Sequence, residues 1–191
     1  AGDPARIRAP VFARPDVIEQ YRRDFGIDRP LLEQLGSFLW GAIRGDFGNR
    51  SLHETQLLEL FPSLEAIRHA RRHLKSWMRP ERRAVSMWFL PGRARVLHQP
   101  LGVVGIIVPW NYPLLLAVGP LVAALAAGNR VMVKMSEYTP AMSDLFARLV
   151  GKYFADDEVA VVQGDAGVAQ AFALLPFGHL LFTGSTRVGY S

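Results

Sequence analysis

Apolar and polar positions alternate in blocks along most of the chain. Some blocks are short, apolar and rich in β-branched side chains, which predicts strands at residues 94–98, 103–108, 131–135, 159–162 and 179–183. Other blocks have helical length and spacing, which predicts helices at residues 114–127, after Thr139-Pro140 and at 168–174. Strands that alternate with helices of this length indicate βαβ units. We therefore predict an α/β fold with a Rossmann-like parallel sheet.

The first 50 residues have a different pattern, in which helical segments are separated by turns. A first helical run is expected to end at Gly26, and a second begins after Asp28 and stops before Gly45. The second run repeats apolar residues at helical spacing, which gives it one apolar stripe. The sequence thus predicts helical segments at 1–50 that are not an independent domain, followed by a domain at 51–191.

A long amphipathic helix is predicted from Leu57 to Met78. Its apolar positions are expected to face one way: Leu57, Leu60, Phe61, Leu64, Ile67, Leu74, Trp77 and Met78. The other face is basic, with Arg68, Arg71, Arg72 and Lys75 followed by Arg79, Arg82 and Arg83. A nucleic-acid surface and a solvated helix face both fit this cluster. We favour the solvated face and expect no nucleic-acid partner, because no base-reading motif accompanies the charges.

A metal site on the same helix is a weaker alternative. His69 and His73 lie one helical turn apart, which is the spacing of two metal ligands on one helix face. No third ligand or His-Glu-x-x-His motif accompanies them in the sequence. We therefore expect no metal.

Composition narrows the chemistry of the chain. Half of the 191 residues are apolar, so a packed core can form. The absence of cysteine excludes disulfides, thiolate metal sites and a cysteine nucleophile. The net charge of +5 suits an anionic, phosphate-bearing ligand without identifying one.

The stretch from Leu101 to Asn129 carries no charge, so a membrane span is one interpretation. Three prolines and the polar Asn111 interrupt the stretch, and a buried strand followed by a buried helix explains it better. The chain also opens in polar residues without a signal-peptide pattern. We expect no membrane association and a cytoplasmic location.

Candidate site residues follow three of the predicted strands. One strand runs into Trp110-Asn111, the next into Ser136-Glu137, and the last into Gly184-Ser185. In an open parallel sheet, ligands bind beyond the carboxyl ends of the strands. The sequence therefore predicts one crevice that receives all three strand ends.

The residue types at these ends suit a nucleotide. Lys134 and Glu137 can hold a ribose diol, or can form an ordinary surface ion pair. Gly184 and Ser185 can bind a phosphate through backbone N–H groups and a hydroxyl, or can simply cap a helix. The Asn111 amide can stabilise an oxyanion, or can close a loop. The common Gly-x-Gly-x-x-Gly dinucleotide motif is missing.

Five motifs in register resemble the aldehyde dehydrogenase superfamily. They are Gln99-Pro100-Leu101-Gly102-Val103, Pro109-Trp110-Asn111-Tyr112-Pro113, Ala126-Ala127-Gly128-Asn129, Lys134-Met135-Ser136-Glu137 and Phe182-Thr183-Gly184-Ser185-Thr186. From about residue 47 onward the chain looks closest to coniferyl aldehyde dehydrogenases, through Trp77-Met78-Arg79-Pro80 and Leu175-Pro176-Phe177-Gly178-His179. Met135 stands where the family commonly has proline.

The resemblance implies roles for individual residues. Asn111 would be the oxyanion-hole asparagine. The other implied roles concern the cofactor: Ile107, Val108, Pro109 and Trp110 would line its groove, Lys134 and Glu137 would hold the adenosine ribose, Gly164 would lie near the adenine, and Gly184 and Ser185 near the pyrophosphate. The implied cofactor is NAD, with NADP not excluded, and Glu137 favours NAD because its carboxylate would repel a 2′-phosphate. The resemblance also implies a small aldehyde as substrate, coniferaldehyde among the candidates, and assembly as a homo-oligomer.

The same resemblance limits the expected activity. In this family a cysteine thiolate attacks the aldehyde, hydride passes to NAD(P)⁺, and a glutamate activates the water that releases the acid. The chain has no cysteine, and it stops at Ser191, before the segment that would carry the glutamate. We expect it to be an amino-terminal, cofactor-binding fragment with an incomplete sheet that is catalytically inactive by itself. A non-catalytic nucleotide-binding module is the alternative.

A second resemblance concerns the first 50 residues. The segments Gly2-Asp3-Pro4-Ala5-Arg6, Ile27-Asp28-Arg29-Pro30-Leu31-Leu32 and Arg44-Gly45-Asp46-Phe47-Gly48 resemble an extracytoplasmic stretch of dipeptide-type ABC-transporter permeases. This implies a chimera, or a fragment related to membrane transport. The membrane helices of that family and its ATPase-binding loop are not in the sequence, so we expect no transport.

Overall fold

The computed structural model describes residues 31–189, and the predicted helical run ending at Gly26 lies outside them. The chain divides into two compact units, residues 1–41 and residues 42–191. Helix α3 (Leu31–Phe47) lies across the division and confirms the second predicted amino-terminal helix, although it continues through Gly45. The elements that carry the predicted site all belong to the second unit.

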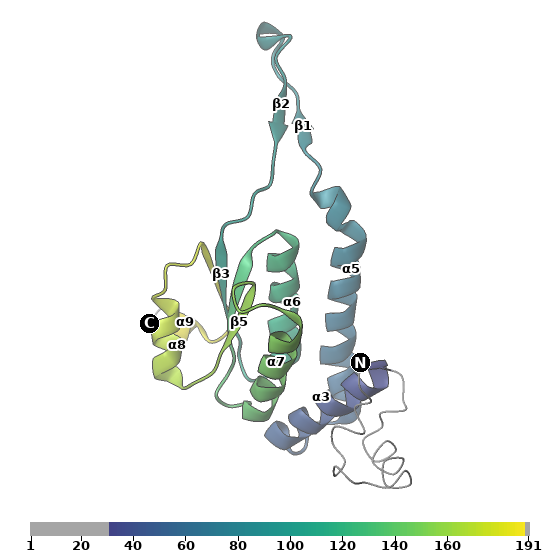
Figure 1. Ribbon diagram of the computed structural model, residues 1–191, viewed down its shortest axis with the longest axis vertical. Helices are drawn as coiled ribbons and strands as arrows, with labels where there is room; N and C mark the ends of the chain where they lie inside the picture. The colour runs from purple at the N-terminus through teal and green to yellow at the C-terminus, as the bar shows by residue number, and fades with distance from the viewer. Residues whose placement is uncertain (1–30, 190–191) are drawn as a thin grey trace, which may run out of the picture. The chain divides into compact units, whose positions relative to one another are not determined.

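A four-stranded parallel sheet forms the centre of the second unit (Figure 1). Its strands are β3 (Val103–Ile107), β4 (Arg130–Lys134), β5 (Val159–Val162) and β6 (His179–Phe182). Their order across the sheet is β5-β4-β3-β6, and all three neighbouring pairs are parallel. The predicted α/β class and parallel sheet are confirmed, and each bound of these four strands lies within one residue of its expected position.

Helices connect consecutive strands and cover the sheet. They are α6 (Pro113–Ala126), α7 (Pro140–Tyr153) and α8 (Ala166–Ala173). The short α9 (Thr186–Gly189) follows the last strand, β6. The chain moves outward from β3 through α6 and α7, then crosses back through α8 to the other side of β3. Right-handed crossovers place helices on opposite faces when the direction reverses in this way. Figure 1 accordingly shows α8 across the sheet from α6 and α7.

Burial on both faces explains the continuous apolar runs of the central strands. Val104, Ile106, Val131 and Val133 share one face of β3 and β4, and all four are buried. On the opposite face Gly105 and Lys134 are buried and Met132 is half-buried, so the central strands are largely covered on both sides. Gly105 permits the close approach of α8 and its following loop, because a Cβ there would lie 2.6 Å from the ring of Phe177. The apolar stretch from Leu101 to Asn129 therefore contains a buried strand and a helix.

The predicted helix from Leu57 to Met78 is confirmed but begins earlier. Helix α4 (Leu52–Thr55) continues through a π-helical turn, η1 (Gln56–Leu60), into α5 (Phe61–Trp77). A π turn holds one extra residue and rotates the helix faces on either side of it relative to each other.

The apolar positions predicted to share one face of this helix are not the positions that the fold buries. Its fully buried side chains are polar, Thr55, Glu59 and Ser63, at successive intervals of four residues. Most of the predicted apolar positions are exposed instead: Leu57, Phe61, Ile67, Trp77 and Met78. Helical spacing identified the helix, but it did not identify which of its side chains the fold buries.

A two-stranded antiparallel hairpin follows α5. It consists of β1 (Glu81–Arg83), which the apolar pattern did not predict, and β2 (Ala94–Val96) within the predicted strand at 94–98. Every residue of both strands is exposed. The 3-10 turn η2 (Met87–Phe89) forms the tip, which carries exposed apolar side chains.

The uncharged stretch from Leu101 to Asn129 folds as β3, a loop and the 14-residue α6. Among the residues that the structure describes, every helix falls short of the combined length and apolarity that a membrane crossing requires. The stretch thus folds as the strand and the helix that the sequence favoured.

Candidate functional site

The carboxyl ends of the four strands lie in one row. Ile107 of β3 pairs with Lys134 of β4 on one side and with Phe182 of β6 on the other, and Lys134 pairs with Val162 of β5. The row continues by one hydrogen bond, because the Val108 amide donates to the Lys134 carbonyl at 2.9 Å. The sheet therefore brings the three predicted strand ends to the same edge.

Lys134 is the most enclosed of the predicted site residues, with 1 % of its surface exposed. Its Nζ donates hydrogen bonds of 2.8 Å to the carbonyl oxygens of Met135 and Gly164. A buried ammonium normally needs such partners, because losing hydration is costly for a charged group. Lys134 thus ties the end of β4 to the loop after β5.

Glu137 completes this cluster. Its carboxylate lies 3.7 Å from Lys134 Nζ and remains partly exposed, at 34 % of the side chain. A buried cation beside an accessible carboxylate is suited to hold a diol, since the carboxylate accepts from hydroxyls while the ammonium donates to them. The surface ion pair considered from the sequence does not describe it, because Lys134 is buried.

Gly164 reaches this cluster through its backbone. Its φ of 143° is accessible to glycine, and a Cβ there would lie 2.6 Å from Val168. The Asp165 side chain caps α8 directly afterwards by accepting from the Val168 amide. Glycine at this position therefore allows the loop to turn and present its carbonyl to Lys134.

The segment after β3 moves from the core to the surface. Val108 is buried, Ile107 and Pro109 are half-buried, and Trp110 and Asn111 are exposed. The exposed pair precedes the first turn of α6. The amide of Asn111 is therefore presented at the carboxyl edge, at the strand where the sheet order reverses direction.

Gly184 and Ser185 follow β6 on the other side of this reversal, and both are exposed. The Ser185 carbonyl accepts from the amides of Val188 and Gly189 at 3.1 Å each, which forms the short α9. β3 and β6 are neighbours, so the Trp110 and Ser185 segments leave adjacent strands.

A buried ion pair beneath the Asn111 segment was not predicted from the sequence. The Arg50 and Glu59 side chains are 6 % and 0 % exposed, and Arg50 Nη1 lies 2.9 Å from Glu59 Oε1. Arg50 Nη1 also donates to the Asn111 carbonyl at 2.9 Å. Glu59 Oε2 accepts from the amides of Leu114 and Leu115 at 2.7 and 3.3 Å. The pair therefore contacts both ends of the turn between β3 and α6.

Burial has a measurable consequence for Glu59. Loss of hydration raises the pKa of its carboxyl above the ordinary value of 4.5, although Arg50 and the amides of Leu114 and Leu115 act in the opposite direction. The charge of Glu59 faces the first turn of α6, where negative charge is favourable. One feature of the sequence hinted at it, namely a lone acid inside the apolar run Leu57-Leu58-Glu59-Leu60-Phe61.

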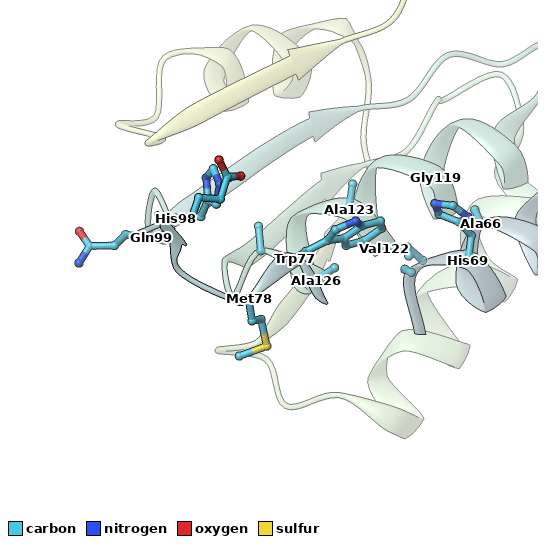
Figure 2. Close-up of a pocket in the computed structure, with 13 residues that line it drawn as sticks. Ala66, His69, Trp77, Met78, His98, Gln99, Gly119, Val122, Ala123 and Ala126 are labelled. Carbon is cyan, nitrogen blue, oxygen red and sulfur yellow. The ribbon is translucent and has the colours of Figure 1, made fainter. Parts of the chain in front are cut away.

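A cavity of about 570 Å³ lies elsewhere, between α5 and α6 (Figure 2). Figure 2 shows His69 and Trp77 of α5 facing Gly119, Val122 and Ala123 of α6. The cavity reaches the carboxyl-terminal half of α6, whereas the predicted residues gather at its amino-terminal end. None of the predicted site residues lines it, so this cavity does not coincide with the predicted site.

The two histidines considered as metal ligands stack on each other, with ring centroids 4.1 Å apart. His73 Nδ1 also lies 2.9 Å from the His69 carbonyl. Within residues 31–189, no cluster of three or more His, Cys, Asp or Glu side chains is arranged to hold a metal.

Comparison with known proteins identifies the family. Residues 50–191 match the model of the aldehyde dehydrogenase family. The chain belongs to the aldehyde dehydrogenase family. The superfamily resemblance drawn from the five motifs is thereby confirmed.

Individual relatives agree with this assignment. A probable coniferyl aldehyde dehydrogenase of Pseudomonas aeruginosa is 56% identical over 161 residues, covering 84% of this chain and 34% of the relative. The solved structure of Staphylococcus aureus AldH in a substrate-bound state has a TM-score of 0.77 and 31% identity, covering 83% of this chain and 36% of AldH. The NAD complex of Pseudomonas PnpE has a TM-score of 0.71 and 29% identity, covering 83% of this chain and 32% of PnpE. The chain thus spans about a third of the relatives it matches.

The permease resemblance of residues 1–50 is not supported. The match to the Pseudomonas aeruginosa relative covers 84% of the chain, so it extends into residues before 50. Asp46, within the supposed permease segment, accepts hydrogen bonds from the Ala141 and Met142 amides at the start of α7. Short motifs of glycine, aspartate and proline recur at many turns, which explains the misleading likeness.

Proposed function

We propose that this aldehyde dehydrogenase chain binds a nicotinamide dinucleotide at the carboxyl edge of the sheet. The observation that carries the proposal is the buried Lys134, which holds the Gly164 carbonyl and lies beside the accessible Glu137 carboxylate. An ammonium and a carboxylate at a parallel strand end match the donors and acceptors of a ribose diol. The proposed cofactor domain spans residues 51–191, and the segment before it continues into the same compact unit from Ala42.

The remaining residues have places consistent with such a ligand. We assign Lys134 and Glu137 to the adenosine ribose and Gly164 to the adenine side. Residues after β3 and β6, which are adjacent strands, face the rest of the dinucleotide in this proposal: Ile107, Val108, Pro109 and Trp110 along the groove, with Gly184 and Ser185 near the pyrophosphate. Val108 is buried, so it contributes backbone and core packing.

Asn111 has a separate proposed role. Asn111 is exposed at the carboxyl edge of the sheet. In this proposal its amide donates to the aldehyde oxygen that gains negative charge during attack, because a positioned amide donor stabilises such an oxyanion. The bound dinucleotide would supply the hydride acceptor. The protein's own residues would bind it, orient it and stabilise charge on the substrate oxygen.

NAD is the proposed dinucleotide, with NADP as the alternative. The Glu137 carboxylate is partly exposed beside the proposed ribose position, where it would repel a 2′-phosphate. The NAD complex of PnpE supports the choice of NAD by similarity. A small aromatic aldehyde is the proposed substrate of the whole enzyme, on the similarity to the Pseudomonas aeruginosa relative.

The 191-residue chain itself is proposed to bind without oxidising. Attack on the aldehyde requires a thiolate in the mechanism that the family resemblance implies, and the chain has no cysteine. Incubation with NAD⁺ and coniferaldehyde should therefore produce no NADH absorbance above the protein-free rate. NADH formation by the purified chain would contradict this part of the proposal.

Calorimetric titration tests the binding. NAD⁺ should bind more tightly than NADP⁺, and Glu137→Gln should weaken NAD⁺ and reduce the difference between the two dinucleotides. Glu65→Gln is the matched control, because Glu65 lies partly exposed on α5 and away from the strand ends. Absence of heat with millimolar NAD⁺, while the chain remains folded by circular dichroism, would disprove the proposal.

Two further assignments are proposals of the same kind. We place the protein in the cytoplasm and expect the whole enzyme to assemble as a homo-oligomer. Cell fractionation and light scattering of the purified protein test these two statements.

A further inference from the structure

We propose that Arg50 and Glu59 are positioning residues that fix the turn carrying Trp110 and Asn111 between β3 and α6. The inference rests on the proposed function for its consequence on ligand binding, but the positioning itself is a property of the described contacts. It concerns the orientation of the segment, whereas the proposed function concerns what that segment contacts.

The first step is the hydrogen bond from Arg50 Nη1 to the Asn111 carbonyl, at 2.9 Å. It joins residues 61 positions apart and holds the backbone of the proposed oxyanion residue directly. A carbonyl fixed by a charged donor has little freedom to rotate, because such bonds are stronger than those between neutral groups. The Asn111 side chain is left to face outward, and it is exposed.

The second step is the placement of the guanidinium itself. Its Cζ atom lies 4.6 Å from the Tyr112 ring centroid and 5.0 Å from the Phe47 ring centroid. The Phe47 ring in turn lies 6.3 Å from the ring of Trp110. Cation-π contacts with two rings restrict the planar guanidinium more than one ion pair does. Arg50 therefore contacts the turn directly through the Asn111 carbonyl and the Tyr112 ring, and it reaches Trp110 only by way of Phe47.

Glu59 fixes the other end of the turn. Its Oε2 accepts from the Leu114 and Leu115 amides, which are among the first donors of α6. The N-cap residue Tyr112 makes no side-chain cap hydrogen bond, so Glu59 supplies the cap from 55 residues away. The π turn η1 is the element that carries this carboxylate.

The cost of the pair argues against a purely stabilising role. Arg50 Nε and Nη2 are buried without a hydrogen-bond partner among the described residues. Glu59 Oε1 lies close to Arg50 Nη1 but without hydrogen-bond alignment. A buried ion pair is weak evidence for stability when its donors are incompletely satisfied. What the pair does hold is the geometry of residues 109–115.

The test uses the whole chain labelled with 5-fluorotryptophan. The chain has four tryptophans, and the ¹⁹F resonance that is lost in Trp110→Phe is the one beside the turn. Arg50→Lys keeps a positive charge near Glu59 but removes the planar fork and its fixed hydrogen bond to Asn111. We expect Arg50→Lys to shift or broaden the Trp110 resonance, and Glu59→Gln to have the same effect because it releases Arg50.

Amide hydrogen exchange supplies a second readout. Glu59→Gln should raise the exchange rate of the Leu114 and Leu115 amides at least tenfold, whereas Arg50→Lys, which leaves the carboxylate in place, should raise it less. Coupling between the two residues predicts that the double variant moves the Trp110 resonance no further than either single variant.

The matched control is the exposed pair Arg68 and Glu65, whose charged atoms also lie 2.8 Å apart on α5. Arg68→Lys and Glu65→Gln should leave the Trp110 resonance and the α6 amides unchanged. If Arg50→Lys lowers the unfolding midpoint and leaves Trp110 unmoved, the pair is merely structural and the inference is wrong. An Arg50→Lys chain that does not fold leaves Glu59→Gln to decide by the same criteria.

Calorimetry with NAD⁺ separates this inference from the proposed function. We expect Arg50→Lys to weaken NAD⁺ binding about five- to tenfold, since small displacements of positioning groups have effects of this size or larger. If the unchanged chain binds no NAD⁺, the proposed function fails, and the Trp110 resonance still decides the positioning. If NAD⁺ binds and the variant matches it in affinity and in the Trp110 signal, only the positioning fails.

Discussion

Two arginine–glutamate pairs lie in and just before the continuous helix from Leu52 to Trp77. They differ in how much of their side chains is exposed to solvent. Arg50 and Glu59 approach within 2.9 Å with almost no exposed surface. Arg68 and Glu65 approach within 2.8 Å, with 51 % and 40 % of their side chains exposed. The distances are nearly equal, so distance does not separate the two regions. Their surroundings do.

Water around the exposed pair weakens its attraction and replaces either partner that is lost. Around the buried pair, protein atoms take that place: the Asn111 carbonyl, the rings of Phe47 and Tyr112, and the first amides of α6. Removal of one buried charge therefore disturbs several other groups. The comparison teaches that the same two residue types can fix a turn or merely solvate a helix.

The largest expected effect distinguishes the two arginines by stability. Arg50→Met should lower the free energy of unfolding by about 3–5 kcal/mol, because it leaves the Glu59 charge buried and unpaired. Arg68→Met should change it by less than about 0.5 kcal/mol, as is usual for exposed pairs. Urea unfolding followed by circular dichroism measures both. Similar losses from the two variants would remove the distinction between the regions.

The same contrast between buried and exposed charges can be tested with two lysines, Lys134 and Lys152. Lys134→Met should cost about 2–3 kcal/mol of unfolding free energy, because the carbonyls of Met135 and Gly164 lose a charged donor. Lys152→Met, on the exposed face of α7, is the control and should be nearly neutral. Thermal unfolding of both variants checks this, and equal midpoints would show that Lys134 is not bound as tightly as its contacts indicate.

Replacing each of two glycines by alanine tests how the surroundings of the added methyl group determine its effect on the stability of the chain. Gly105→Ala should destabilise the chain by about 1–3 kcal/mol, because the new Cβ would press on Phe177 and on Leu180 of the neighbouring strand β6. Gly151→Ala, in α7 with no atom near the added Cβ, should stabilise by up to about 1 kcal/mol. Denaturant midpoints of the two variants are expected to move in opposite directions. A shift of the same sign would contradict the packing of β3.

The smallest expected effect is the pH dependence of Glu59. Its pKa is raised in the folded chain, so it favours folding most below 4.5, and this contribution is lost as the pH rises through the folded value. Arg50 and Glu54 are the charged groups that face it. The stability difference between the unchanged chain and Glu59→Gln should therefore fall with rising pH in that window, by about 1.4 kcal/mol for each unit by which the pKa is raised.

Denaturation at several pH values from 4 to 8 measures that difference, and subtracting the variant removes every other titrating group. A difference that grows with pH would mean that Arg50 and the α6 amides outweigh burial. The Arg50–Glu59 region would then resemble an ordinary stabilising ion pair.

Much of the fold followed from local pattern. The β-branched runs around Val104, Val131 and Val159 predicted three strands of the sheet, because strands buried on both faces have little choice but to be apolar. The grouping of Asn111, Lys134 and Glu137 at one edge also followed, because parallel strands end on the same side. These predictions required only the order of elements along the chain.

Long-range packing explains the predictions that were wrong or missing. The apolar positions through Leu57 and Phe61 were expected to share one face, yet the helix buries Thr55, Glu59 and Ser63 instead. A π turn changes which residues of a helix share a face, and the spacing of apolar residues does not predict where such a turn occurs. Likewise, nothing in the sequence joins Glu59 to Leu114 or Asp46 to Met142, because each contact depends on where two distant elements meet.

The sequence by itself determined the alternation of strands and helices, the residues at the strand ends and the family to which they belong. The tertiary structure decided which charges are enclosed. Enclosure is a property of everything packed around a side chain, so Lys134 and Glu59 became buried ions while Glu65 and Arg68 remained in water. The residue types are the same in both places, and only their surroundings differ. This difference distinguishes the proposed site and the Arg50–Glu59 pair beside it from the solvent-exposed surface of the helix.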